Sequence, residues 1–154
     1  MKVACGFDHA GFPLKEMVLS VLREEGHQPI DLGTNSTDPV DYPDIALTVC
    51  RAVISGDAER GVLVCGSGAG VAVAANKVFG IRGCAIHDHY TARQGVEHDD
   101  LNVLCLGARV IGPETAADVL RAFVGAEFSG VERHVRRLAK IAEIEREGLG
   151  AQLS

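Results

Sequence analysis

The sequence lacks several features that would assign it to a common protein class. It contains no tryptophan, only two tyrosines and five phenylalanines, and no apolar run near the roughly 18–20 residues of a membrane span. Its five cysteines are odd in number, widely spaced and without a Cys-x-x-Cys pair, which argues against a disulfide framework or a zinc knuckle. The first residues lack the apolar stretch and small-residue cleavage site of a secretory leader. We therefore expect a protein of the reducing cytoplasm that does not enter a membrane.

Positive charge is also scarce, with 15 Lys and Arg against 21 Asp and Glu and a net charge of −6. An acidic chain argues against nucleic-acid partners, which need a broad basic face, so any anionic ligand must meet a local cluster of cations. The length of 154 residues suits one domain over 1–154, because domains cluster at roughly 100–200 residues. The composition, 47% hydrophobic and 23% charged, is typical of a globular protein with an ordinary core.

Short apolar runs alternate with segments of helical periodicity along most of the chain. The expected strands are 2–7, 28–32, 61–65, 81–86 and 103–106, and the expected helices are 12–25, 45–55, 67–78, 90–97, 113–124 and 131–147. The segment 33–44, rich in Asp and Pro, is predicted to be a loop. Strands that alternate with helices indicate right-handed crossovers and a parallel sheet covered on both faces. Ligands of such sheets bind beyond the carboxyl ends of the strands, so functional residues are sought directly after each strand.

The most informative segment is Cys-Gly-Ser-Gly-Ala-Gly at 65–70, between a predicted strand and a predicted helix. Alternating glycines there expose backbone N–H groups at a helix N-terminus, a suitable site for a phosphate or a developing oxyanion. A dinucleotide fingerprint would need glycine at position 71, and a phosphatase loop would need arginine there, but the chain has Val71. No Gly-Lys-Ser/Thr follows, which excludes a Walker A loop. The alternative is a tight strand–helix turn with a buried cysteine.

Cys65 is the candidate reactive thiol, because it lies at the start of a helix, where a thiolate base or nucleophile is favoured. Cys5, Cys84 and Cys105 instead fall within predicted strands and are expected to be inert core thiols. Since cysteines are often buried without a function, an inert Cys65 is the alternative.

Histidines and acidic residues also follow predicted strands. Asp8 and His9 come directly after the first strand, at the sheet edge where Cys65 is expected, although such a pair can simply cap a turn. His98, in Glu-His-Asp-Asp before the last strand, is a candidate general acid or base near neutral pH, or part of a solvated loop. The segment His-Asp-His at 87–89 has no third ligand at matching spacing, so no metal site is predicted there.

Cations concentrate near the C-terminus, in Arg-His-Val-Arg-Arg at 133–137 and in Lys140. Arg133 and Arg137 are four residues apart and share one face of the predicted helix. Two guanidinium groups on that face can hold a phosphate. The apolar side of the helix is formed by Val131, Val135, Leu138 and Ala142. A solvated amphipathic helix is the alternative interpretation.

The ordered set of these motifs resembles the ribose-5-phosphate isomerase type B family, which also holds galactose-6-phosphate and allose-6-phosphate isomerases. The matching segments, in chain order, are Asp8-His9-Ala10-Gly11, Asp41-Tyr42-Pro43, Cys65-Gly66-Ser67-Gly68-x-Gly70, Ala74-Ala75-Asn76-Lys77, Gly80-Ile81-Arg82, the segment around His98, Gly107-x-Arg109 and Arg133-His134-x-x-Arg137. The resemblance covers essentially the whole chain, and the ordered set is far more specific than any single motif.

The resemblance implies a Rossmann-like three-layer α/β/α sandwich with a five-stranded parallel sheet. It also implies a homodimer, or a tetramer of such dimers, in which the C-terminal helix over 131–147 packs on the partner subunit and active sites form across the interface. The expected reaction is an aldose–ketose isomerisation of a phosphosugar through a cis-enediolate, without a cofactor or a metal. The expected partners are the phosphosugar and a second copy of the chain.

The resemblance also implies roles for individual residues. Cys65 is the base that moves a proton between C1 and C2. Ser67 and the backbone N–H groups of Gly66, Gly68, Ala69 and Gly70 stabilise the enediolate oxygen. Asp8 and His98 serve ring opening and the sugar hydroxyls, with His98 supplied by the other subunit. The phosphate is held by His9, Arg109, Arg133 and Arg137, and Tyr42 lines the sugar pocket.

One position departs from the family pattern. Many members have asparagine after the catalytic histidine, where this chain has Asp99. An amide can donate a hydrogen bond to a sugar oxygen, whereas a carboxylate can only accept one, so Asp99 either indicates a different sugar or points away. The open alternatives are therefore an allose 6-phosphate or galactose 6-phosphate isomerase, a non-catalytic sugar-phosphate-binding subunit, and a flavodoxin-like nucleotide-binding module.

Overall fold

A parallel five-stranded sheet forms the centre of the protein in a computed structural model that describes residues 1–148. The last six residues of the domain expected over 1–154 lie outside the described residues. The strands are β1 (Lys2–Phe7), β2 (Gln28–Asp31), β3 (Arg60–Cys65), β4 (Gly83–Ala85) and β5 (Val103–Gly107), in the order β2-β1-β3-β5-β4. All four neighbouring pairs are parallel, so their carboxyl ends meet at one edge.

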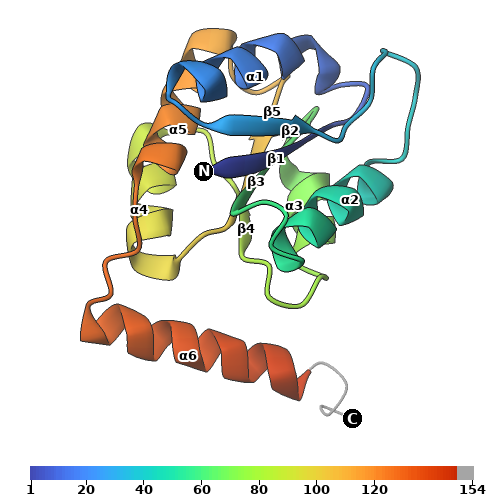
Figure 1. Ribbon diagram of the computed structural model, residues 1–154. Helices are drawn as coiled ribbons and strands as arrows, with labels where there is room; N and C mark the ends of the chain where they lie inside the picture. The colour runs from blue at the N-terminus through green and yellow to red at the C-terminus, as the bar shows by residue number, and fades with distance from the viewer. Residues whose placement is uncertain (149–154) are drawn as a thin grey trace.

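Helices cover both faces of this sheet, which confirms the expected three-layer α/β/α architecture (Figure 1). One face packs against α1 (Lys15–Glu24), α4 (His89–Asp99) and α5 (Pro113–Gly125), and the other against α2 (Tyr42–Ile54) and α3 (Ala69–Ala75). Alternate residues of each central strand point to opposite faces, and all residues of β5 and all but the first residue of β3 are fully or almost fully buried. This burial on both faces explains the continuous apolar runs in the sequence.

Several predicted boundaries were wrong. The segment 42–44 belongs to α2 rather than to a loop, because Asp41 is extended at the N-cap position and Pro43 fits the first helical turn. Helix α3 is shorter than 67–78, since Gly68 adopts a left-handed conformation with a φ of +79° directly before it. The chain before α1 forms a short 3-10 turn over Phe12–Leu14.

Two of the three cysteines that were expected to be core thiols are buried in the structure. Cys5 and Cys105 are fully buried in β1 and β5. Burial raises the pKa of Cys5 to about 12 and also raises the pKa of Cys105. The prediction of a core thiol was wrong for Cys84, which is exposed. Its strand, β4, forms the edge of the sheet, and an edge strand is less completely covered than the central ones.

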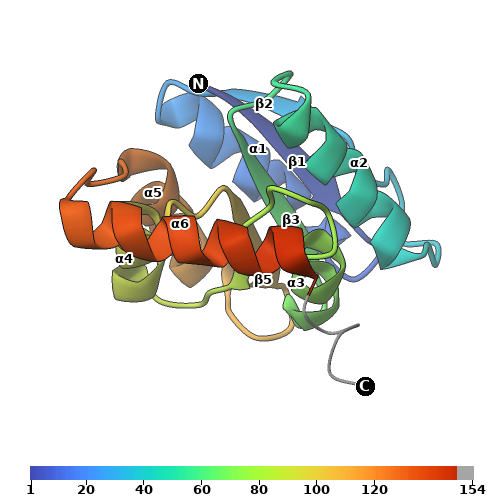
Figure 2. The ribbon, with the colours of Figure 1, turned by 90° about the horizontal axis from the view of Figure 1, so that it is seen from below.

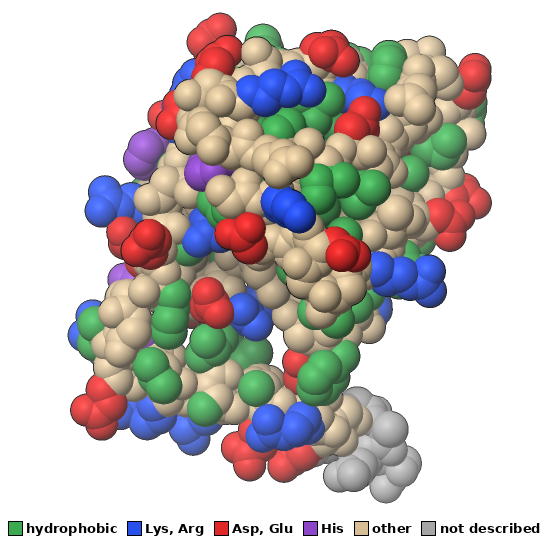
Figure 3. Space-filling view, in the orientation of Figure 1, with side chains coloured by type: hydrophobic (Ala, Val, Ile, Leu, Met, Phe, Trp, Pro, Cys, Tyr) green, Lys and Arg blue, Asp and Glu red, His purple; other side chains and the backbone are tan. Residues whose placement is uncertain are grey.

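The last helix, α6 (Glu132–Glu147), stands apart from the sandwich and crosses one side of it (Figures 1 and 2). Apolar side chains on it are exposed, including Val135 at 48%, Ile141 at 45% and Ile144 at 58%. Figure 3 shows hydrophobic side chains gathered along this helix at the bottom of the molecule. Among residues 1–148, no helix combines the length and apolarity needed to cross a membrane.

Candidate active site

A pocket of about 400 Å³ opens at the carboxyl edge of the sheet, where β1, β3 and β5 end. It is lined by Asp8, His9, Ala10, Tyr42, Cys65, Gly66, Ser67, Gly70, Arg109 and Val110. Segments far apart in the sequence meet here because parallel strands place their carboxyl ends together. The structure thus brings into one pocket most of the residues that were expected to carry the chemistry.

Cys65 ends β3 and is 5% exposed at the base of the pocket. Its Sγ accepts a hydrogen bond from the backbone N–H of Gly68 at 3.1 Å, which fixes the sulfur beside the glycine loop. Ser67 Oγ accepts one from the N–H of Ala69 at 3.2 Å. The loop can pack this closely because β5 ends in Gly107, where a Cβ atom would lie 2.6 Å from the Ser67 carbonyl. The result is a thiol and a hydroxyl beside a turn of backbone N–H groups.

Asp8 follows β1 and is almost fully buried, with 5% of its surface exposed. Its Oδ1 accepts hydrogen bonds from the backbone N–H groups of Ala10 at 2.9 Å and Gly11 at 2.8 Å. Within the described residues, no hydrogen bond engages the second carboxylate oxygen. The side chain therefore both shapes its own turn and leaves one acceptor for a ligand in the pocket.

The turn formed by Asp8–Gly11 lies directly against β3. A Cβ atom at Gly11 would lie 2.0 Å from the carbonyl oxygen of Val64, although the backbone at Gly11 has an ordinary φ of −83°. We expect Gly11→Ala to lower the free energy of unfolding by about 3 kcal/mol, because the added methyl group displaces backbone. Urea unfolding measures this change. The control is Gly125→Ala in α5, where nothing lies within 4 Å of the new atom and stability should hold or rise by up to about 1 kcal/mol. Equal stability of the two variants would contradict the prediction.

His9 has a defined hydrogen-bonding role. Its Nδ1 lies 3.3 Å from the backbone N of Val40 and accepts that N–H. An amide N–H can only donate, so Nδ1 carries no proton and the ring hydrogen is on Nε2. His9 therefore presents an N–H donor to an anion in the pocket.

Tyr42 and Arg109 complete the walls of the pocket. Tyr42 begins α2 and packs on α3 at Gly70, where a Cβ atom would lie 2.9 Å from the phenol ring. Arg109 follows β5, and its backbone N–H donates to the carbonyl of Gly66 at 3.0 Å. Arg109 and His9 both line the pocket, so an anionic ligand bound here would contact both side chains.

The remaining predicted residues lie elsewhere in the same chain. His98 and Asp99 end α4, and Arg133 and Arg137 are exposed on α6. None of these four residues lines the Cys65 pocket. They form a second group of residues, which we call the α4–α6 cluster.

His134 joins the two helices of the α4–α6 cluster. Its ring stacks on the His98 ring with the centroids 4.1 Å apart, and its Nδ1 lies 2.6 Å from Ser129 Oγ. The sequence motifs predict no separate role for His134. The available signal was its spacing of four residues from Leu138, which places both residues on the inward face of α6.

The two histidines of the segment 87–89 contact other parts of the protein. His87 Nε2 accepts the backbone N–H of Gly107 at 2.8 Å, and burial lowers the pKa of this ring. His89 Nδ1 lies 3.0 Å from Asp118 Oδ1 on α5. Within the described residues, no group of three or more His, Cys, Asp and Glu side chains is arranged to hold a metal ion.

Comparisons with known proteins show which family the chain is similar to. A family model described as Ribose/Galactose Isomerase matches residues 3–141. The ribose-5-phosphate isomerase B of Escherichia coli is 42% identical over 144 residues, covering 94% of this chain and 96% of that protein. A D-erythrulose-4-phosphate isomerase of Pectobacterium atrosepticum is 39% identical over 132 residues, covering 84% and 86%. The solved ribose-5-phosphate isomerase B of Clostridium thermocellum superposes with a TM-score of 0.92 at 45% identity, covering 96% of this chain and 99% of that one.

Proposed function

Because this chain belongs to the ribose/galactose isomerase family, we propose that it interconverts D-ribose 5-phosphate and D-ribulose 5-phosphate through a cis-enediolate. Membership makes it an aldose–ketose isomerase of phosphorylated sugars. The observation that carries the proposal is the position of the Cys65 sulfur beside the N–H groups of the 66–70 loop, in the pocket that also holds Asp8 and His9. A base next to oxyanion donors is what proton transfer alpha to a carbonyl requires.

The proposed chemical step is a proton transfer between adjacent carbons. The Cys65 thiolate removes the C2 proton of the open-chain aldose, and the electron pair of that C–H bond forms the C1–C2 double bond as negative charge moves to O1. The hydroxyl proton on O2 then passes to O1, so that the negative charge moves to O2. Return of the carbon-bound proton from Cys65 to C1, with formation of the C2–O2 carbonyl, gives the ketose and restores the thiolate. Ser67 and the loop N–H groups stabilise the charged oxygen. Loss of one such donor typically costs about 2.7–4 kcal/mol of transition-state stabilisation.

Binding is divided between the two ends of the substrate. The phosphate lies against His9 and Arg109, and Tyr42 lines the sugar-binding part of the pocket. The phosphate takes no part in the reaction, so its binding energy serves to orient C1 and C2 over Cys65. Asp8 and His98 exchange protons with the ring oxygen and the C1 hydroxyl, which opens the furanose before isomerisation.

The working unit is a homodimer with two shared active sites. In this proposal His98 serves ring opening, and Arg133 and Arg137 bind the phosphate together with His9 and Arg109. Yet His98, Arg133 and Arg137 all lie outside the Cys65 pocket of their own chain. A second copy of the chain delivers its α4–α6 cluster to that pocket. The exposed apolar side chains of α6 support this arrangement, because packing on a partner would bury them.

A cytoplasmic location fits the same proposal. All five cysteines are free thiols, as is usual in a reducing compartment.

The test is turnover of D-ribose 5-phosphate by the purified protein after EDTA treatment, followed as ketose formation. We expect saturable turnover on the order of 10 s⁻¹. D-allose 6-phosphate and D-galactose 6-phosphate serve as comparison aldoses, and D-erythrulose 4-phosphate, itself a ketose, is followed as loss of the ketose. Activity on one of these alone would overturn the pentose assignment while keeping the isomerase class, and Asp99→Asn would then be the first variant to test on D-ribose 5-phosphate. A folded protein inactive on all four would overturn the catalytic proposal and favour a binding subunit.

A further inference from the structure

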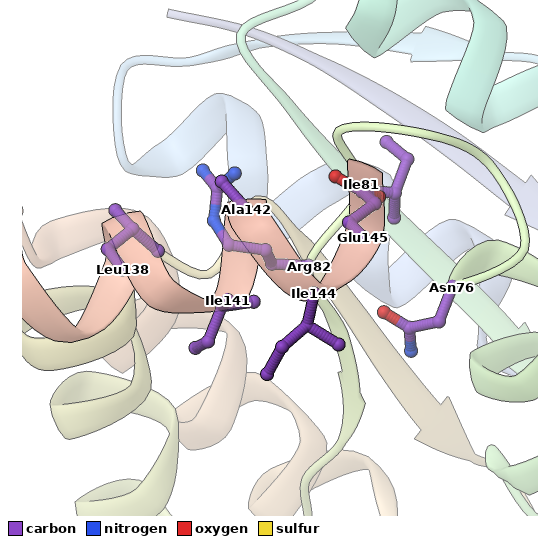
Figure 4. A pocket seen from close by; sticks show the side chains of 8 residues that line it. All are labelled: Asn76, Ile81, Arg82, Leu138, Ile141, Ala142, Ile144 and Glu145. Carbon is purple, nitrogen blue, oxygen red and sulfur yellow. The ribbon is translucent and has the colours of Figure 1, made fainter. Parts of the chain in front are cut away.

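The turn at residues 80–82, between α3 and β4, contacts both helices of the α4–α6 cluster. Together with α6 it borders a cavity of about 280 Å³ that is separate from the Cys65 pocket. Figure 4 shows Ile81 and Arg82 of this turn against α6, beside Ile141 and Glu145. The turn is therefore placed to act on two helices at once.

Arg82 fixes the end of α4. Its Nε donates to the backbone carbonyl of Asp100 and its Nη2 to Asp100 Oδ2, both at 2.7 Å. Asp100 caps α4 in the left-handed region with a φ of +48°, the only non-glycine residue among those described with a positive φ. His98 and Asp99 immediately precede it. Two charge-assisted hydrogen bonds in a fixed geometry thus determine where the last turn of α4 lies.

The other end of the turn fixes α6. The backbone N–H of Gly80 donates to Glu145 Oε1 at 2.9 Å, in the C-terminal part of the helix. The opposite end of α6 is held at His134, which stacks on His98. These two contacts hold a helix whose apolar residues Ile141 and Ile144 stay exposed. The orientation of α6, and with it that of its arginines, depends on them.

The 80–82 turn is itself anchored to the sheet. Asn102 Oδ1 accepts the backbone N–H of Arg82 at 2.8 Å, and Asn102 Nδ2 donates to the carbonyl of Gly80 at 2.9 Å. The carbonyl of Asn102 in turn accepts the N–H of Gly61, in β3, at 2.8 Å. The turn is therefore a rigid link between the sheet and the two helices.

We propose that the 80–82 turn is a positioning element, through which Arg82 and Glu145 hold the α4–α6 cluster in the geometry that the active site of the partner subunit needs. This inference rests on the proposed function, in which the cluster acts across the dimer interface. Arg82 and Glu145 are positioning residues, since neither touches the Cys65 pocket. Arg82 acts through Asp100 on His98, and Glu145 acts through α6 on Arg133 and Arg137.

Stability alone does not account for these contacts. The side chains of Arg82 and Asp100 are 28% and 42% exposed, and ion pairs of this kind contribute little to the free energy of unfolding. An effect on catalysis should therefore be separable from an effect on folding.

The first test is a kinetic comparison of two variants. We expect Arg82→Met to lower kcat about tenfold with little change in KM, because the displaced group is the acid–base histidine. Glu145→Ala is expected to raise KM about fivefold with little change in kcat, because the displaced groups bind the phosphate throughout the reaction. Arg51→Met, an exposed position on α2, is the matched control. Thermal unfolding should be nearly unchanged in all three. A loss of stability without the split between kcat and KM would overturn the proposal.

The second test locates the effect in the dimer. Two differently tagged chains are co-expressed, and the mixed dimer is purified. A dimer of Arg82→Met with Cys65→Ala contains one site with an intact thiol and an intact α4–α6 cluster, so we expect about half of the wild-type activity. A dimer of Arg82→Met with His98→Asn contains no intact site, and we expect about 5%. The reverse ranking would show that Arg82 acts on its own Cys65 pocket and would overturn the inference. A control dimer of Cys65→Ala with His98→Asn tests the shared site itself, so failure of that proposal is distinguishable.

Discussion

A mixed dimer of one Cys65→Ala chain and one His98→Asn chain is expected to regain about half of the wild-type activity, although each variant alone is nearly inactive. Cys65 and His98 lie in different parts of one chain, since the Cys65 pocket does not include His98. If each site combines Cys65 of one copy with His98 of the other, one site of the mixed dimer receives both substitutions. The second site receives neither and is intact.

The measurement is ketose formation by the purified mixed dimer at saturating substrate. The two variant homodimers provide the baseline. A mixed dimer of Cys65→Ala with Ser67→Ala is the matched control, because both residues line the same pocket of one chain. In that control each site carries one substitution, so no intact site forms. Activity no higher than the baseline in the first mixed dimer would show that His98 does not act across an interface.

Replacing Cys65 by alanine should lower kcat by about 1,000-fold, with KM changed by less than about threefold. The thiol is the base in the proposed proton transfer, and general acid–base catalysis contributes typically about 10²–10⁴-fold. The phosphate binding proposed for His9 and Arg109 does not involve the sulfur, so affinity for the substrate should be retained. A loss of this size corresponds to about 4 kcal/mol of transition-state stabilisation.

Steady-state kinetics on D-ribose 5-phosphate and the exchange of the C2 proton with solvent deuterium measure the effect on the same step. Cys84→Ala is the control, because Cys84 is the exposed cysteine and has no place in the proposed reaction. Full turnover by Cys65→Ala would refute the cysteine base. Loss of ketose formation with exchange retained would place Cys65 at a different step.

The strands and helices that form the layers of the fold were predictable because each has a local pattern of apolar residues. Burial on both faces of β5 and of β3 after Arg60 favours a continuous run of apolar residues, and the helices carry their apolar residues at intervals of three and four. The start of α2 was missed because aspartate and proline are typical of loops and also of a first helical turn. Cys84 was misplaced because sequence does not reveal which strand is the edge.

Within the candidate site, the sequence by itself determined which residues meet at the carboxyl ends of the strands. Asp8 directly follows β1 and Cys65 is the last residue of β3, and parallel strands end at one edge, so their meeting follows from chain order. A role for Arg109, two residues after β5, was expected only from the resemblance to the family. Tertiary structure alone decided contacts between side chains on separate elements. Val40 orients His9 from 31 residues away, Arg82 holds Asp100, and His134 stacks on His98. No periodicity encodes such contacts, because they depend on how loops and helices pack after the sheet has formed. The same packing separates the α4–α6 cluster from the pocket that it is proposed to complete in a second copy of the chain.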